Sequence, residues 1–268
     1  MISARFFRLT VLVICGLCGC ANKPQVVQPP LQYQREGVVA AFTSEDWKIV
    51  LGKVVTSGGY VRWDLLQKDP AIRDALMRYV TLIAAVSPDN RPDLFQTTAD
   101  RLAYWINAYN AACMYGVLLR NQTNPPALYA MDHFSFGGNA LTLDEVEQQK
   151  IKPLNDPRAA FAINRCTHSS PPLRREPYEG LTLSAQLVDQ GKTFLNDSRG
   201  VVRVDDVAKV SDLLVINYGP EFLAAYQRKY NKPGTLLQAI EPYAAKHSAL
   251  SGAKKIVPMG YDASLNRP

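Results

Sequence analysis

The pattern of apolar and polar positions predicts a chain of amphipathic helices with a few short strands between them. The strongest helical periodicity lies in 99–120, where apolar residues three and four apart form one apolar face. Capping and apolar periodicity predict further helices over residues 43–55, 70–86, 142–150, 182–195, 220–230 and 236–244. Strand patterns predict hairpins over 133–141 and 201–210, and single strands over 60–63 and 159–164. The sequence shows neither internal repeats nor a regular βαβ alternation, so the fold class that we expect is α+β around one core.

The first residues have the pattern of a bacterial lipoprotein signal. Arg5 and Arg8 precede an apolar run that is too short to cross a bilayer, and the sequence Leu-Cys-Gly-Cys ends at Cys20. This ending resembles a lipobox, so we expect residues 1–19 to be removed and Cys20 to be lipidated. Ala21 in place of aspartate implies delivery to the outer membrane, with the protein facing the periplasm. An ordinary cleaved signal peptide or an uncleaved anchor are the alternatives.

The remaining chain divides into a tether and one domain. Residues 20–35 are rich in proline and glutamine and show no periodicity, which is typical of a linker. We expect a single domain over 36–268, attached to a membrane through the lipid anchor. The net charge is +6, but the basic residues are scattered, so we expect no nucleic acid partner.

Cysteine usage and motif content restrict the chemistry. After the leader only Cys113 and Cys166 remain, and a disulfide between them is one possibility in an oxidising compartment. The sequence holds no metal-ligand spacing, no Walker-type loop and no Rossmann fingerprint. We therefore predict neither a metal nor a cofactor.

Two asparagines stand out in the strongest helix. Asn107 and Asn110 lie three residues apart among apolar neighbours, although asparagine competes with the backbone for hydrogen bonds inside a helix. One interpretation is that their amides bind the backbone of an adjacent segment. The other is that they line a cleft and contact a ligand.

Several segments, taken in order, resemble a family known as domain of unknown function 547. They are residues 103–111 (AYWINAYNA), 141–147, 156–158 with 161–162, 171–174 with Tyr178, 185–187, 194–195 and 261–266. The resemblance covers roughly 43–266 and implies an α+β domain whose activity is not established. It also suggests a distant relation to papain-like or transglutaminase-like folds.

The sequence departs from the family pattern at positions that carry reactive side chains in the family. Ala160 takes the place of a histidine, and Arg165 and Ser170 take the places of two cysteines, with Ser169 in place of a glycine. Cys166 is displaced by one position. If the family's cysteines and histidine do chemistry or form a disulfide, this chain lacks them.

One hypothesis is a thiol-dependent hydrolase or acyltransferase. Cys166 is the candidate nucleophile, and His168 or His133 is the candidate base, because a thiol needs a base within hydrogen-bond reach. Ser169 or Ser170 are alternative nucleophiles. The competing interpretation is that Cys166 is an inert buried residue and His168 a loop residue bonded to backbone.

The other hypothesis, which we favour, is a binding or scaffold domain for an envelope protein or a small ligand. Its cleft would be lined by Asn107, Asn110, His133, His168 and Arg174. Arg165 and Arg175 lie near Arg174 in the sequence, and the planar fork of arginine suits carboxylate or phosphate recognition.

Overall fold

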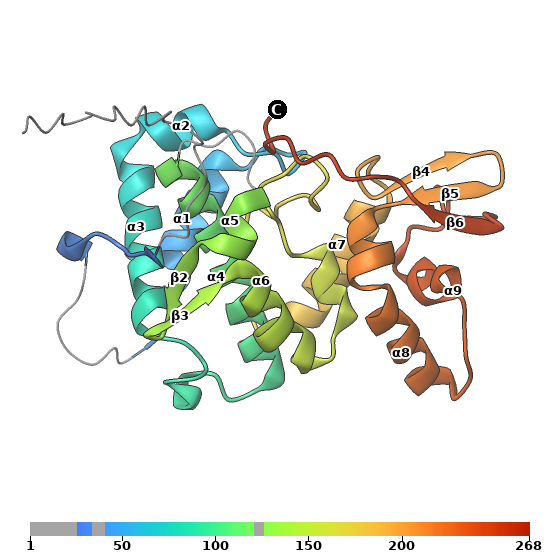
Figure 1. Cartoon of the computed structure of the whole chain (residues 1–268), viewed down its shortest axis with the longest axis horizontal. Coiled ribbons are helices and arrows are strands. Elements are labelled where there is room, and N and C mark those ends of the chain that lie inside the picture. The colour runs from blue at the N-terminus through green and yellow to red at the C-terminus, as the bar shows by residue number, and fades with distance from the viewer. Residues whose placement is uncertain (1–25, 34–40, 121–125) are drawn as a thin grey trace, which may run out of the picture.

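The computed structural model describes residues 26–33, 41–120 and 126–268, which form an α+β fold (Figure 1). The α-helices of this part are α1 (Glu45–Val54), α2 (Trp63–Lys68), α3 (Pro70–Ala85), α4 (Thr98–Arg120), α5 (Pro126–Met131), α6 (Leu143–Val146), α7 (Leu183–Leu195), α8 (Gly219–Tyr230) and α9 (Leu236–Ile240). Its strands are β1 (Val26–Val27), β2 (His133–Phe136), β3 (Asn139–Thr142), β4 (Val201–Val204), β5 (Val207–Val210) and β6 (Lys255–Pro258). Most of the predicted helices and both hairpins are confirmed.

Helix α4 is the central element of the core. Every residue from Leu102 to Val117 is buried, so the prediction of a single apolar face was wrong. Small residues let neighbouring elements approach the helix on several sides. Gly116, for example, faces Leu128 and Phe134 so closely that a methyl group there would collide with both. A helix that is covered all round fixes the position of each polar side chain it carries.

Helices α1, α2 and α3 pack on one side of this core. The Asp69 carboxylate caps α3 by accepting from the N–H groups of Ala71 and Ile72, and Pro70 occupies the first turn. Trp47 of α1 stacks on Tyr79 of α3 with ring centroids 5.7 Å apart. The strand expected over 60–63 is wrong, because only Val61 forms an isolated bridge, to Val55, and α2 begins directly afterwards.

The first sheet has the order β1-β2-β3. Strands β2 and β3 form the predicted hairpin, in which His133 pairs with Thr142. The side chain of Thr142 then starts α6 through a capping box with Glu145, as its spacing predicts. Helix α6 continues into the short helix η3 (Glu147–Ile151).

Part of the segment expected to be a tether lies against the domain. Strand β1 pairs in parallel with β2, and the Tyr33 hydroxyl donates to Asp74 of α3 at 2.6 Å. Residues 1–25 and 34–40, which include the expected signal peptide and Cys20, lie outside the described residues. No helix in the described part of the chain is long and apolar enough to span a membrane.

The strand expected over 159–164 is wrong, because this segment begins with the 3-10 helix η5 (Pro157–Phe161). The Asp156 carboxylate accepts from the Arg158 N–H, and Pro157 fixes the first helical position. These local signals outweigh the β-like apolar run that follows. The segment is buried, as its composition suggests, but its backbone turns toward the loop after it.

The C-terminal part adds a second, separate sheet of order β4-β5-β6, with α8 and α9 beside it (Figure 1). Strands β4 and β5 form the predicted hairpin, which turns at Asp205 with a left-handed backbone. Strand β6 joins β5 in parallel, and the chain then returns across the molecule so that residues 261–266 reach the loop 164–172.

Candidate functional site

Helix α4 holds two separate backbone segments through its asparagines. The Asn107 amide donates to the Tyr178 carbonyl at 2.7 Å and accepts from the Tyr178 N–H at 3.0 Å. One turn later, Asn110 donates to the Ala162 carbonyl at 3.0 Å and accepts from the Asn164 N–H at 2.8 Å. Both side chains are buried. The two amides therefore fix the chain on either side of the loop 164–172.

Cys166 lies in this loop with a left-handed backbone, at φ +56°. That conformation costs on the order of 1–3 kcal/mol for a residue that has a Cβ. Two hydrogen bonds hold it: the Cys166 N–H donates to Asn164 Oδ1 at 2.8 Å, and the Asn266 N–H donates to the Cys166 carbonyl at 2.8 Å. The loop shape is thus imposed by its surroundings.

The C-terminal segment 261–266 covers the same loop. The His168 N–H donates to the Ser264 carbonyl at 2.7 Å. The Tyr261 hydroxyl lies 2.5 Å from the Thr167 hydroxyl. Residues almost a hundred positions apart therefore close over Cys166, which is 1% exposed.

A buried ion pair lies beside the loop. Arg165 Nη2 is 2.7 Å from Glu147 Oε2 of η3, and the two side chains are 15% and 1% exposed. The guanidinium also lies over the Tyr129 ring, 5.6 Å from its centroid. Burial opposes the charge on Arg165, but the hydrogen-bonded carboxylate of Glu147 holds its pKa well above the ordinary value. The guanidinium therefore stays charged inside the protein.

Two tyrosine hydroxyls approach this pair from different elements. Tyr109 lies on α4, and Tyr218 directly precedes α8. Both are buried, and both interact electrostatically with Glu147 and Arg165. Among the described residues, neither hydroxyl has a hydrogen-bond partner. Burial raises both phenol pKa values well above the usual range, so both remain neutral. We call Asn107, Asn110, Glu147, Arg165 and Cys166 the buried centre.

The thiol of Cys166 is not placed as a nucleophile would be. Burial, together with a hydrogen bond to the Cys113 thiol, raises its pKa well above the ordinary value, whereas attack requires a thiolate. Both thiols are free. His133 points its Nδ1 at the Met131 carbonyl, 3.2 Å away, and the His168 ring lies against Tyr60 with centroids 6.0 Å apart.

No hydrogen bond among the described residues joins either imidazole to the Cys166 thiol. The two serines of the loop are also engaged. Ser170 Oγ accepts from the Arg165 N–H at 3.0 Å, and Ser169 Oγ accepts from the Asp262 N–H at 2.7 Å. Arg165, Ser169 and Ser170 thus stabilise the loop through these bonds.

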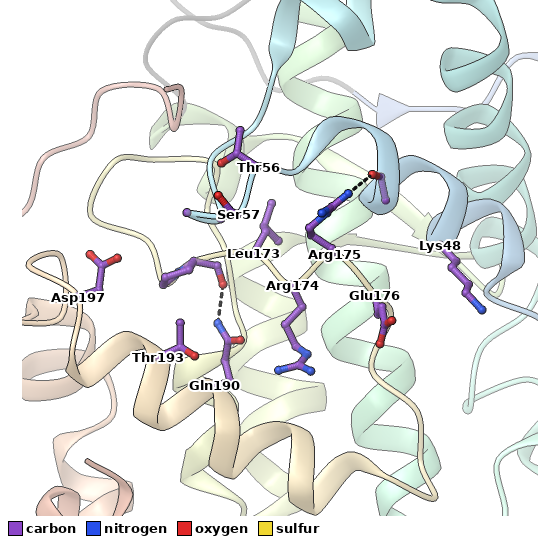
Figure 2. Close-up of a pocket in the computed structure, with 14 residues that line it drawn as sticks. Lys48, Thr56, Ser57, Leu173, Arg174, Arg175, Glu176, Gln190, Thr193 and Asp197 are labelled. Atoms are coloured by element: carbon purple, nitrogen blue, oxygen red, sulfur yellow. Dashed lines mark hydrogen bonds between the residues drawn. The ribbon is translucent and has the colours of Figure 1, made fainter. Parts of the chain in front are cut away.

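An open groove of about 670 Å³ lies outside the buried centre, between α1 and α7 (Figure 2). The loop 56–59 forms one end, and the segment 172–176 crosses its floor. Its lining residues are Lys48, Gly52, Thr56, Ser57, Gly58, Gly59, Pro172, Leu173, Arg174, Arg175, Glu176, Gln190, Thr193 and Asp197. The floor is fixed by the Leu173 N–H, which donates to the Gly59 carbonyl at 3.1 Å, and by Gln190, which donates to the Pro172 carbonyl.

The cations of the groove differ in their partners. Arg174 points toward α7, where it pairs with Asp189 at 2.5 Å, and the Asp189 side chain is 64% exposed. Arg175 points toward α1 and donates to the Gly52 carbonyl at 3.0 Å, a bond that leaves its charge uncompensated (Figure 2). Among the described residues, neither Arg175 nor Lys48 has an ion-pair partner. The lining also carries two carboxylates, Asp197, which pairs with Arg199, and Glu176, which has no ion-pair partner among the described residues. The three cations of the groove outnumber these carboxylates, so the groove keeps a small excess of positive charge that favours an anion.

The sequence-predicted residues do not form one cleft. Arg174 and the neighbouring Arg175 line the open groove, whereas Asn107 and Asn110 hold backbone. His133, Cys166 and His168 do not line the groove. The sequence reasoning missed Lys48 and Glu147. Glu147 follows Leu143 by four residues, the spacing of one helix face, so a charge on an apolar face was the available signal. Lys48 carried no such signal in the sequence, because it is a single exposed lysine on an amphipathic helix.

The described residues contain no cluster of three or more histidine, cysteine, aspartate or glutamate side chains that could hold a metal ion. No curated protein and no solved structure matches the chain. The buried centre and most of the groove floor lie within one continuous part of the sequence. That part, residues 94–195, matches the model of the family described as "Protein of unknown function, DUF547".

Proposed function

We propose that this protein is a binding domain and that the open groove recognises an anionic group, either a carboxylate or a phosphate. The observation that carries the proposal is the pair of cations, Arg175 and Lys48, that line a 670 Å³ hollow without an acidic partner among the described residues. Charges on a rigid concave surface attract a ligand of opposite sign and orient it.

Arg175 is prepared for this role by its bond to the Gly52 carbonyl, which restricts the side chain and leaves other N–H groups of the fork to donate. Arg174 is a second donor. Its partner Asp189 is largely exposed, so solvent weakens the pair and a ligand anion can compete for the guanidinium.

The thiol-enzyme alternative finds no comparable support. Its nucleophile would be a neutral, buried thiol whose neighbour is a second thiol. A binding role requires none of these groups to react. Its requirements are an accessible concave surface and uncompensated charge, and the open groove has both.

We further propose that the domain works at the bacterial outer membrane on the periplasmic side, anchored through acyl chains on Cys20. The support is the leader sequence alone: basic residues, a short apolar run and a small-residue step before the cysteine. Mass spectrometry of the native protein tests this directly. An unmodified N-terminus that still carries residues 1–19 would exclude it.

The groove is tested by titrating citrate, a tricarboxylate, into the purified domain and measuring affinity by calorimetry. Loss of one charge-assisted contact should weaken binding about tenfold, so Arg175→Gln and Lys48→Gln should each have that effect. Lys232→Gln is the matched control, because this exposed lysine lies outside the groove. Binding that is absent, or that is equal in all four proteins, would refute the proposal.

A further inference from the structure

A second hollow of about 310 Å³ begins where the open groove ends. Lys48 lines both hollows. The segment 172–176 forms the floor of the first, and the next residues, 177–180, line the second. Both also contact α1, through Lys48 and Gly52 in the first hollow and through Glu45 and Lys48 in the second. The two hollows therefore form one elongated path.

The second hollow carries the opposite charge. Its lining includes the carboxylates of Glu45, Asp100 and Glu179 and no cation other than the shared Lys48. Among the described residues, neither Glu45 nor Glu179 forms an ion pair. The lining also contains the aromatic residues Phe42, Phe95, Tyr104 and Tyr178, and Asn107. Carboxylates beside aromatic faces suit a cationic side chain with an apolar stem.

Backbone groups are also open along this path. The residues Arg174, Arg175 and Glu176 are at least partly exposed. Within the described part of the chain, none of their N–H or carbonyl groups takes part in a hydrogen bond. By contrast, the flanking groups are bonded: the Leu173 N–H to Gly59, and both groups of Tyr178 to Asn107. A ligand that lies on this floor meets alternating donors and acceptors.

We infer that the two hollows bind one extended peptide, with acidic residues in the larger hollow beside Arg175 and a basic residue in the smaller one beside Glu45 and Glu179. This inference rests on the proposed anion recognition and adds the ligand's class and polarity. A peptide is favoured over an anionic saccharide because it carries both signs of charge on one chain and offers its own N–H and carbonyl groups.

The test compares synthetic hexapeptides at one ionic strength. The charged probes are acetyl-Glu-Glu-Gly-Gly-Lys-Lys-amide and the reversed order, acetyl-Lys-Lys-Gly-Gly-Glu-Glu-amide. In the matched acid-only probes, glutamine replaces both lysines. At least one charged probe should bind about fivefold or more tighter than its acid-only partner, and the preferred order gives the direction of the peptide.

The double variant Glu45→Gln/Glu179→Gln should erase this advantage while leaving citrate and acid-only affinities unchanged. Glu241→Gln, at an exposed position outside both hollows, is the control and should keep it. The inference is overturned if charged and acid-only probes bind equally, or if the advantage of the charged probe survives in the double variant. Citrate binding to the unmodified protein would still support anion recognition by the open groove in either case. Tighter binding of polygalacturonate, insensitive to the double variant, would instead assign a saccharide. If the unmodified protein binds neither the charged peptides nor citrate, both the peptide inference and the proposed anion recognition are excluded.

Discussion

The buried centre and the open groove use polar residues in opposite ways. In the buried centre, each asparagine amide bonds to two backbone groups, and the one arginine has a buried carboxylate partner. In the groove, Arg175 and Lys48 keep their charges uncompensated among the described residues. A polar group taken out of water must be satisfied by the protein, whereas one left at a concave surface is available for a ligand.

The difference shows that a distinctive motif need not be where a ligand binds. The segment 103–111 is the most recognisable part of the sequence, yet its two asparagines hold the chain around residues 162–164 and 178. Through Tyr178, Asn107 also fixes the end of the segment that crosses the groove floor. The buried centre therefore positions the groove, and the two regions can be separated by measuring stability and binding independently.

The largest effect is expected from breaking the ion pair of the buried centre. Glu147→Gln leaves the Arg165 charge without its buried partner, and we expect a loss of about 3–5 kcal/mol of unfolding free energy in urea titrations. The double variant Glu147→Leu/Arg165→Met removes both charges and should be more stable than Glu147→Gln. If the single variant loses less than about 1 kcal/mol, the pair does not hold the centre together.

Removing an asparagine amide should have the next largest effect. Asn110→Ala leaves the Asn164 N–H and the Ala162 carbonyl buried without partners, at a cost of about 2–3 kcal/mol in the same urea titrations. Gln149→Ala, at an exposed position of η3, is the control and should change stability by less than about 0.5 kcal/mol. A ligand-contacting Asn110 would instead lose affinity for citrate with stability unchanged.

The sequence predicted the parts of the fold that depend on local patterns. Helices α3 and α4 follow apolar periodicity and caps, and the hairpin β2–β3 with its capping box follows strand alternation and turn residues. It failed over 159–164, where an Asp-Pro start makes a turn of helix from residues that also suit a strand. In that segment the cap from Asp156 and the fixed backbone of Pro157 outweigh the strand propensity of the apolar residues that follow.

The candidate site was less predictable, because it depends on which distant segments meet. Nothing in the local pattern indicates that residues 261–266 cover the loop of Cys166, or that Lys48 and Arg175 line the same groove. Arg174 was named because three arginines cluster around one loop of the sequence and the planar fork of arginine suits carboxylate or phosphate recognition. The bonds of Asn107 and Asn110 match one of the two interpretations that the sequence left open.

Alkaline pH should weaken the fold through the buried phenols. The pKa of Tyr218 is raised by burial, so its folded pKa exceeds its unfolded value near 10. The stability it contributes is complete below about pH 10 and is lost as pH rises further, at up to about 1.4 kcal/mol per pH unit. Tyr218→Phe should make the fall in unfolding free energy above pH 10 shallower by that amount. Tyr230→Phe, at an exposed tyrosine, should leave the slope unchanged; a slope that Tyr218→Phe does not alter would mean that water reaches the phenol.

The smallest effect on stability, with a large effect on binding, is expected at Arg175. Its side chain is exposed and its one bond, to the Gly52 carbonyl, lies at the surface, so Arg175→Gln should change the unfolding free energy by less than about 0.5 kcal/mol. Asn110→Ala should show the reverse pattern when both variants are measured by urea titration and citrate calorimetry. If Arg175→Gln costs as much stability as Asn110→Ala, then the guanidinium is a structural clamp between α1 and the groove floor. The contrast between a buried centre that holds the chain and a groove that is free to bind would then fail, because the same residue would have to serve the fold first.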